Sequence, residues 1–148
     1  KQRGVKIIHQ CGKNAFAGLK ERYETLGLNS SDVELFDFSK EIELKMQKAD
    51  LAISRAGASS LWELCANALP AIFVPFPYAA GDHQYHNAKF LLQKDIAKIC
   101  LQNGNSVDSD EILKLIEGFD IHASSQALST MIGKNGAKQI IDKITSRI

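Results

Sequence analysis

The chain has 148 residues, of which 45% are hydrophobic, so it is long enough to bury the core of one domain. Its 18 basic and 17 acidic side chains nearly cancel, which excludes the broad positive field that non-specific binding to nucleic acid or to an anionic membrane surface requires. We therefore expect no nucleic-acid partner, and any anionic ligand has to be bound by a local group of residues.

Cysteine content and hydropathy indicate a cytoplasmic protein. The three cysteines, Cys11, Cys65 and Cys100, are an odd number and lack the paired spacing of a metal site. The longest apolar stretch, residues 68–80, contains all three prolines of the chain and is too short to span a bilayer. We expect neither a transmembrane helix nor a signal peptide. Because the chain starts at Lys1 and enters an apolar segment almost at once, we also expect it to be part of a longer protein.

Short apolar runs alternate with segments of helical periodicity, which is the pattern of βαβ units that build a parallel sheet. The predicted strands are residues 5–9, 33–36, 51–54, 71–74 and 97–101. We expect an α/β fold, in which a Rossmann-like parallel sheet is covered by helices on both faces and a helical tail ends the chain. No repeat or linker divides the sequence, so a single domain is expected over residues 1–148.

Apolar residues at helical spacing predict the helices. In chain order these residues are Phe16, Leu19, Tyr23 and Leu26; Leu61, Leu64, Cys65 and Ala68; Ala88, Leu91 and Leu92; Ile112, Leu113, Ile116 and Phe119; and Ile140, Ile141, Ile144 and Ile148. Gly27 stands where a C-terminal cap of the first helix belongs, and Asp82 stands where an N-terminal cap of the third belongs. Gly133 and Gly136 interrupt the tail between its two helices.

The junction after the third predicted strand is the first segment that carries chemistry. Residues 54–60 read Ser-Arg-Ala-Gly-Ala-Ser-Ser, which predicts a strand end, a glycine turn and a helix start. Backbone N–H groups in the first turn of a helix lack intrahelical acceptors and lie at the positive end of its dipole, so they suit a phosphate or diphosphate. Gly57 leaves room for such a group to approach closely.

The same junction also fits a capping box. In this interpretation Ser60 caps the helix and the Glu63 side chain reaches back to the Ser60 backbone N–H. The pattern alone favours the capping box, because a strand, a glycine turn and a serine start occur in many α/β domains that bind no ligand there.

A second polar segment, residues 75–88, is a proline-containing loop that leads into a helix. Loops after parallel strands line the ligand crevice, where His83, Gln84 and Asn87 are placed to hydrogen-bond sugar hydroxyls. A solvated helix start explains these residues equally well. His83 and His86 also suggest a metal pair, but they lack the His-Glu-x-x-His arrangement, so we expect no metal site.

A cysteine nucleophile is a further alternative, because Cys11 follows the first strand close to His9. The segment lacks a glycine-framed elbow and an identifiable third partner, so we interpret Cys11 as a packing residue. His9 ends the strand and is a candidate to face the crevice.

The run of residues 49–64 resembles the signature of the MurG family, Ala-Asp-x-x-x-x-Arg-x-Gly-Ala-x-Thr-x-x-Glu, with Ser60 in place of threonine. The resemblance continues through residues 69–77 and 82–88, and residues 9–12 are similar to the family's His-Gln-x-Gly. Residues 5 to about 101 are covered, whereas the helical tail matches only in type.

MurG proteins are inverting glycosyltransferases of the GT-B fold, built from two Rossmann-like halves. They transfer GlcNAc from UDP-GlcNAc to lipid I, the undecaprenyl-linked muramoyl-pentapeptide, at the cytoplasmic face of the inner membrane, where they are peripheral. The resemblance implies that this chain is the C-terminal, donor-binding half, without its first βα unit and without the N-terminal acceptor domain. It further implies that no cofactor or metal is needed, and that the chain alone is inactive and holds no catalytic residue.

The resemblance also assigns the donor site. It places Ala58, Ser59 and Ser60 at the diphosphate, next to Gly57, which leaves room for its approach, and the carboxylate of Glu63 at the ribose hydroxyls.

For the two ends of the donor, the resemblance places His83 and Gln84 at the GlcNAc hydroxyls, with Asn87 shaping that loop. Phe38 and Ser39 are placed near the segment whose backbone reads uracil, although residues 38–42 depart from the family's Phe-Ile-Asp-Asp-Met.

Two other functions remain open. One is a related enzyme, either a UDP-sugar hydrolase or the catalytic subunit of a two-subunit GlcNAc transferase, which a partner requirement would distinguish. The other is a module that binds a nucleotide sugar without catalysing transfer. The run of residues 82–84 favours a sugar site in each case.

Overall fold

The computed structural model describes residues 4–104, 106–132 and 136–146. Contacts between these residues divide the chain into two compact units, Lys1–Ala49 and Asp50–Ile148. The single domain expected from the sequence therefore stays a prediction. Two of the residues used to predict the tail, Gly133 and Ile148, lie outside the described residues.

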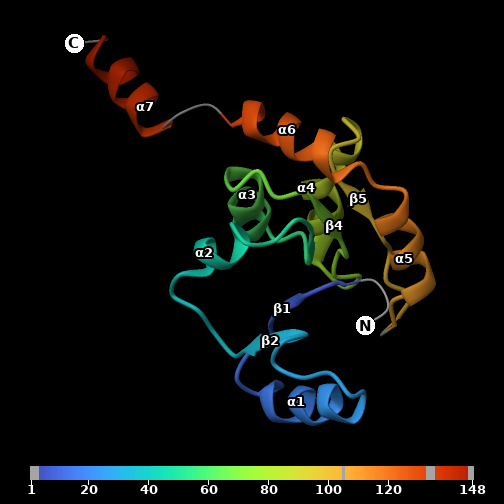
Figure 1. Ribbon diagram of the computed structural model, residues 1–148. Coiled ribbons are helices and arrows are strands. Elements are labelled where there is room, and N and C mark those ends of the chain that lie inside the picture. Colours follow the sequence, from blue (N-terminus) through green and yellow to red (C-terminus); the bar gives the residue numbers. More distant parts are fainter. Residues whose placement is uncertain (1–3, 105, 133–135, 147–148) are drawn as a thin grey trace. The chain divides into compact units, whose positions relative to one another are not determined.

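The first unit contains a two-stranded parallel sheet. Strands β1 (Ile7–Gln10) and β2 (Val33–Phe36) pair with Ile7 opposite Val33. Helix α1 (Phe16–Thr25) connects them and packs against β2, and a short helix, α2 (Ile42–Met46), follows (Figure 1).

The end of α1 shows why Gly27 is needed there. Gly27 has φ of 68°, a left-handed conformation that glycine adopts without steric cost. Its N–H donates to Glu24 O at 2.9 Å, and the next N–H, of Leu28, donates to Tyr23 O at 3.0 Å. These two bonds are a Schellman motif, so the predicted glycine cap is confirmed.

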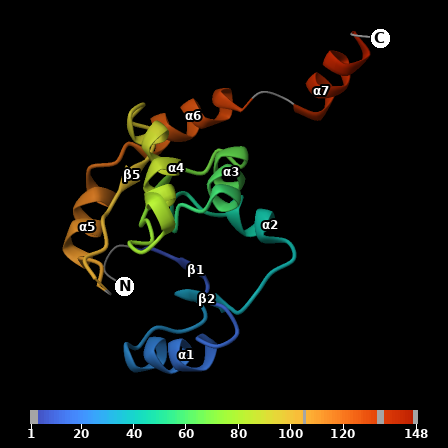
Figure 2. The ribbon, with the colours of Figure 1, turned by 180° about the vertical axis from the view of Figure 1, so that it is seen from behind.

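The second unit contains a three-stranded parallel sheet in the order β3-β4-β5. Its strands are β3 (Ala52–Ser54), β4 (Ala71–Phe73) and β5 (Lys98–Ile99). Its helices are α3 (Ala58–Ala66), α4 (His83–Leu92), preceded by the 3-10 turn η1 (Ala80–Asp82), α5 (Ser109–Glu117), α6 (Ile121–Met131) and α7 (Gly136–Thr145). Helices α3 and α5 lie on opposite sides of β4 in Figure 1, and in the view from behind they lie on opposite sides of α4 (Figure 2). The expected α/β architecture of parallel strands and covering helices is confirmed.

The core of this unit forms around its central strand. Ile72 of β4 is fully buried and clusters with Val74, Cys100 and Phe119. Helix α3 buries Leu61, Leu64 and Cys65, which confirms the apolar stripe predicted for it. None of the helices in the described ranges combines the length and the apolarity needed to cross a membrane.

The thiol of Cys65 provides a test of this core. Burial raises the pKa of Cys65 to about 11. Between about pH 9 and pH 11 the unfolded chain loses this proton while the folded chain keeps it, so the free energy of unfolding should fall as pH rises through that window. Urea denaturation at several pH values measures the slope. In Cys65→Ala the fall should be smaller, and equal slopes in both proteins would contradict a buried thiol.

Candidate functional site

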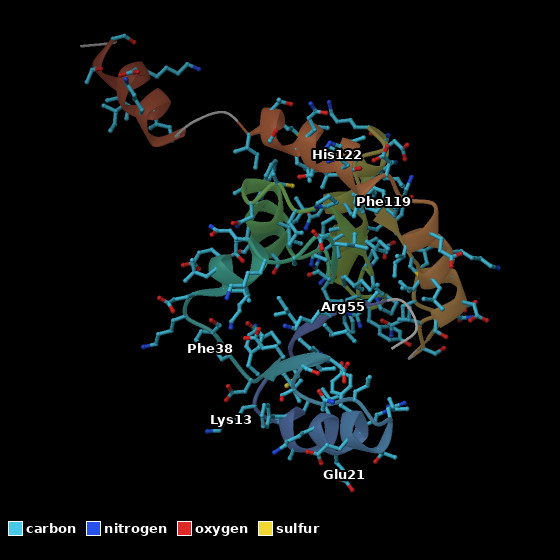
Figure 3. The ribbon with its side chains drawn as sticks, viewed as in Figure 1. Lys13, Glu21, Phe38, Arg55, Phe119 and His122 are labelled. Carbon is cyan, nitrogen blue, oxygen red and sulfur yellow. The ribbon has the colours of Figure 1, made fainter. Side chains whose placement is uncertain are left out.

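The candidate site lies in the second unit, where β3, β4 and β5 end. Because the three strands are parallel, their carboxyl ends meet at one edge of the sheet, and the loops that follow them line that edge. Side chains are drawn in Figure 3, which labels Arg55, the residue that follows β3.

The start of α3 differs from the capping box that the sequence favoured. The helix begins at Ala58 with Gly57 as its N-cap, three residues before Ser60, and no side chain of the described residues caps it. The first backbone hydrogen bond of the helix runs from Leu61 N to Gly57 O at 2.9 Å. The N–H groups of residues 58–60 come before this bond and have no acceptor within the helix. The capping-box interpretation was wrong because Ser60 already lies within the first turn.

Gly57 is not required by the conformation of the chain itself. Its φ of −64° and ψ of 142° are available to any residue, and a Cβ atom added there would meet no atom within 4 Å. The position that a Cβ atom would take at Gly57, next to the first turn of α3, is therefore open.

Glu63 lies one turn further along α3 and is exposed. It follows Ser60 by three positions and Ser59 by four, so the three side chains share one face of the helix. Five residues at 1.5 Å each separate Glu63 from Ala58 by about 7.5 Å along the axis.

The loop after β4 is held by Gln84. The backbone N–H of Phe76 donates to Gln84 Oε1 at 2.9 Å, which fixes the orientation of this carboxamide.

Asp82 occupies the predicted N-cap of α4, but it has φ of 51° and its side chain makes no capping bond, so the predicted side-chain cap was wrong. The left-handed backbone at Gly81 and Asp82 turns the chain from η1 into α4 instead.

Asn87 connects the two loops. Its Nδ2 donates to Ala56 O at 3.0 Å, and Ala56, in the turn between β3 and α3, is fully buried. The structure thus brings Asn87 of α4 to the turn that contains Gly57, while Gln84 of the same helix binds the loop after β4. His83 begins the same helix and is exposed.

Sequence interpretation did not single out Arg55. Its Nη1 donates to Val74 O at 3.0 Å, to Pro75 O at 3.2 Å and to Gln102 Oε1 at 2.6 Å. Its guanidinium carbon also lies 5.6 Å from the ring centroid of Phe76. The position of a charged residue directly after an apolar strand could have indicated a role at the sheet edge. The sequence does not reveal which carbonyl groups such a residue binds.

Phe38 and Ser39 belong to the first unit, where they follow β2. Phe38 is 68% exposed and is labelled in Figure 3. Ser39 Oγ accepts a hydrogen bond from Glu41 N at 3.1 Å. Their uracil-binding role stays a prediction.

His9 and Cys11, which were considered as a crevice residue and as a nucleophile, each contact a residue of the first unit. His9 Nδ1 and Tyr23 Oη are hydrogen-bonded at 2.8 Å, so His9 pairs with the α1 tyrosine and not with Cys11. The Cys11 thiol lies 3.3 Å from Phe36 O. Burial raises the pKa of Tyr23, and the nearby Cys11 makes a smaller contribution in the same direction. Within residues 4–104, 106–132 and 136–146, no three His, Cys, Asp or Glu side chains are grouped to hold a metal ion.

Known proteins similar to this chain share nearly all of its length. Residues 1–144 match the glycosyltransferase family 28 C-terminal domain. A UDP-N-acetylglucosamine--N-acetylmuramyl-(pentapeptide) pyrophosphoryl-undecaprenol N-acetylglucosamine transferase from Campylobacter fetus is 51% identical, over 97% of this chain and 42% of that protein. A protein of the same name from Sulfurovum sp. is 44% identical, over 96% of this chain and 40% of that protein.

A solved structure agrees with these sequences. The crystal structure of Acinetobacter baumannii MurG matches with a TM-score of 0.78 and 27% identity, over 95% of this chain and 43% of that chain. The chain thus spans about two fifths of the length of the relatives it matches. These matches confirm the resemblance to the MurG family, and the chain belongs to glycosyltransferase family 28, as a C-terminal domain of that family.

Proposed function

We propose that the chain is the UDP-GlcNAc-binding part of an inverting glycosyltransferase that transfers GlcNAc to lipid I in peptidoglycan synthesis. The names of the relatives at 51% and 44% identity support this transfer. In this proposal the N-terminal acceptor domain of the same protein binds lipid I, and the whole protein is peripheral on the cytoplasmic face of the inner membrane.

The observation that carries the proposal is the uncapped start of α3 at the carboxyl edge of the sheet. In the proposed reaction the acceptor hydroxyl gives its proton to a general base outside this chain, its oxygen attacks the anomeric carbon, and the bond from that carbon to the diphosphate breaks. The electron pair passes to the leaving oxygen of UDP. Negative charge that grows there is stabilised by the N–H groups of residues 58–60 and by the helix dipole.

The remaining contacts follow from the two helices. Glu63, about 7.5 Å along α3 from the first turn, is placed to accept hydrogen bonds from the ribose hydroxyls. The carboxamide oxygen of Gln84 already binds Phe76 N, so its NH₂ group is the part that donates to a GlcNAc hydroxyl, beside His83. Asn87 holds the turn that contains Gly57 against α4.

Calorimetric titration of the full-length protein with UDP-GlcNAc, UDP and ADP, without added metal, tests the proposed function. We expect both uridine ligands to bind more tightly than ADP, and UDP-GlcNAc to bind more tightly than UDP because the sugar adds hydrogen bonds. Equal affinity for all three ligands, or no binding by folded protein, would contradict the assignment.

The variant Gly57→Ala separates ligand approach from folding. Alanine is a poorer N-cap residue than glycine, which destabilises the helix, but it also lowers the conformational entropy of the unfolded chain, which stabilises the fold. Because these two effects oppose each other, the free energy of unfolding should change by less than about 1 kcal/mol. Affinity for UDP should fall about tenfold or more, because the added methyl group occupies the space left for the diphosphate. Thermal denaturation and calorimetry measure the two effects, and unchanged UDP affinity would show that the open space is not used.

The variant Glu63→Ala tests the ribose contact. We expect UDP binding to weaken by about 1–3 kcal/mol, since a hydrogen bond to a charged group is lost. Glu21→Ala, which removes an exposed carboxylate from α1, is the matched control and should bind UDP as the wild type does. Unchanged UDP affinity in Glu63→Ala, with only the melting temperature lowered, would remove Glu63 from the site.

A further inference from the structure

The guanidinium group of Arg55 links the ends of three neighbouring strands. Arg55 follows β3, its two carbonyl acceptors, Val74 and Pro75, follow β4, and its side-chain acceptor, Gln102, follows β5. All three acceptors are neutral groups, so among the described residues orientation of the guanidinium depends on hydrogen-bond geometry and not on a carboxylate partner.

Gln102 has a distinct part in this arrangement. Nη1 of arginine carries two hydrogens but contacts three acceptors here, so two of the acceptors must share one hydrogen. The shortest contact, 2.6 Å, is to Gln102 Oε1, and the neighbouring carbonyls of Val74 and Pro75 are at 3.0 and 3.2 Å. Gln102 therefore takes one hydrogen for itself and directs the other toward the end of β4.

The Gln102 carboxamide is itself fixed. Its Nε2 donates to Gly104 O at 2.7 Å, in the tight turn that follows β5. Because one end of the planar carboxamide is held by this carbonyl, the other end presents Oε1 to Arg55.

The contact continues from Arg55 to the sugar side of the site. Pro75, whose carbonyl Arg55 binds, is followed by Phe76, whose ring lies under the guanidinium and whose N–H binds Gln84 Oε1. Movement of Arg55 would thus shift the backbone that orients the Gln84 carboxamide.

We propose that Gln102 is a positioning residue of the donor site, which acts through Arg55 and the backbone of residues 75 and 76 to orient Gln84 toward the sugar. This inference rests on the proposed function, since it assigns Gln84 to the GlcNAc end of the donor. It assigns no catalytic step to Gln102, which touches other residues of the chain and not the reacting atoms.

The test compares UDP-GlcNAc with UDP in calorimetric titrations of the full-length protein. Gln102→Ala should weaken UDP-GlcNAc about 3- to 10-fold, the range of one ordinary net hydrogen bond, because its effect reaches the sugar only through Arg55 and Gln84, and should leave UDP unchanged. Gln102→Glu should weaken UDP-GlcNAc less than Gln102→Ala does, because a carboxylate still accepts from the guanidinium although it cannot donate to Gly104 O. Gln93→Ala, at the exposed end of α4, is the matched control and should change neither affinity.

A double-mutant cycle tests the route. Gln102→Ala should cause no further loss of UDP-GlcNAc affinity once Gln84 is replaced by Ala. The proposal is overturned if Gln102→Ala weakens both ligands equally, if Gln102→Glu behaves like Gln102→Ala, or if the two losses add. Failure of the wild type to prefer UDP-GlcNAc over UDP would instead contradict the proposed function.

Discussion

The candidate site depends on the parallel alignment of β3, β4 and β5. Parallel strands end at the same edge of the sheet. Beyond that edge the backbone carbonyls that follow the central strand no longer receive hydrogen bonds from a neighbouring strand. At this edge the carbonyls of Val74 and Pro75 receive their hydrogen bonds from Arg55, a side chain that begins on the neighbouring strand end. The loops that follow β3 and β4 are therefore fixed to each other by a side chain as well as by the backbone.

The electrostatics of this edge are local. The chain carries a formal net charge of only +1. The start of α3 supplies partial positive charge through uncapped N–H groups, and Arg55 supplies a full charge that its neutral acceptors do not cancel. A nearly neutral domain can thus present a small positive region suited to an anion, without the wide field that would attract nucleic acid.

Sequence patterns predicted the parts of the structure that depend on short-range order. The five strands and the apolar stripe of α3 follow from hydropathy, and the cap at Gly27 follows from one residue type. Helix α6 was missed because serine and threonine make its own pattern weak. Tertiary contacts stabilise it: Leu128 is buried, and Ser125 Oγ donates to Ala68 O at 2.8 Å.

The site was predictable to a similar extent and for a similar reason. The glycine turn and the polar start of α4 were identified, because they are contiguous in sequence. The start of α3 was placed three residues late, since Ser60 satisfies the capping pattern as well as the first-turn pattern. Arg55 and Gln102 are 47 residues apart, and only the packed sheet brings them into contact.

The groups at the start of α3 are main-chain atoms, which has a consequence for how this domain can change over time. Amide N–H groups keep their direction whatever side chains are attached, and they do not titrate in the physiological range. An anion held there would be insensitive both to acidity and to most substitutions at residues 58–60. Such a site can persist through extensive sequence drift, provided that the helix keeps its first turn and that Gly57 keeps the space in front of it open.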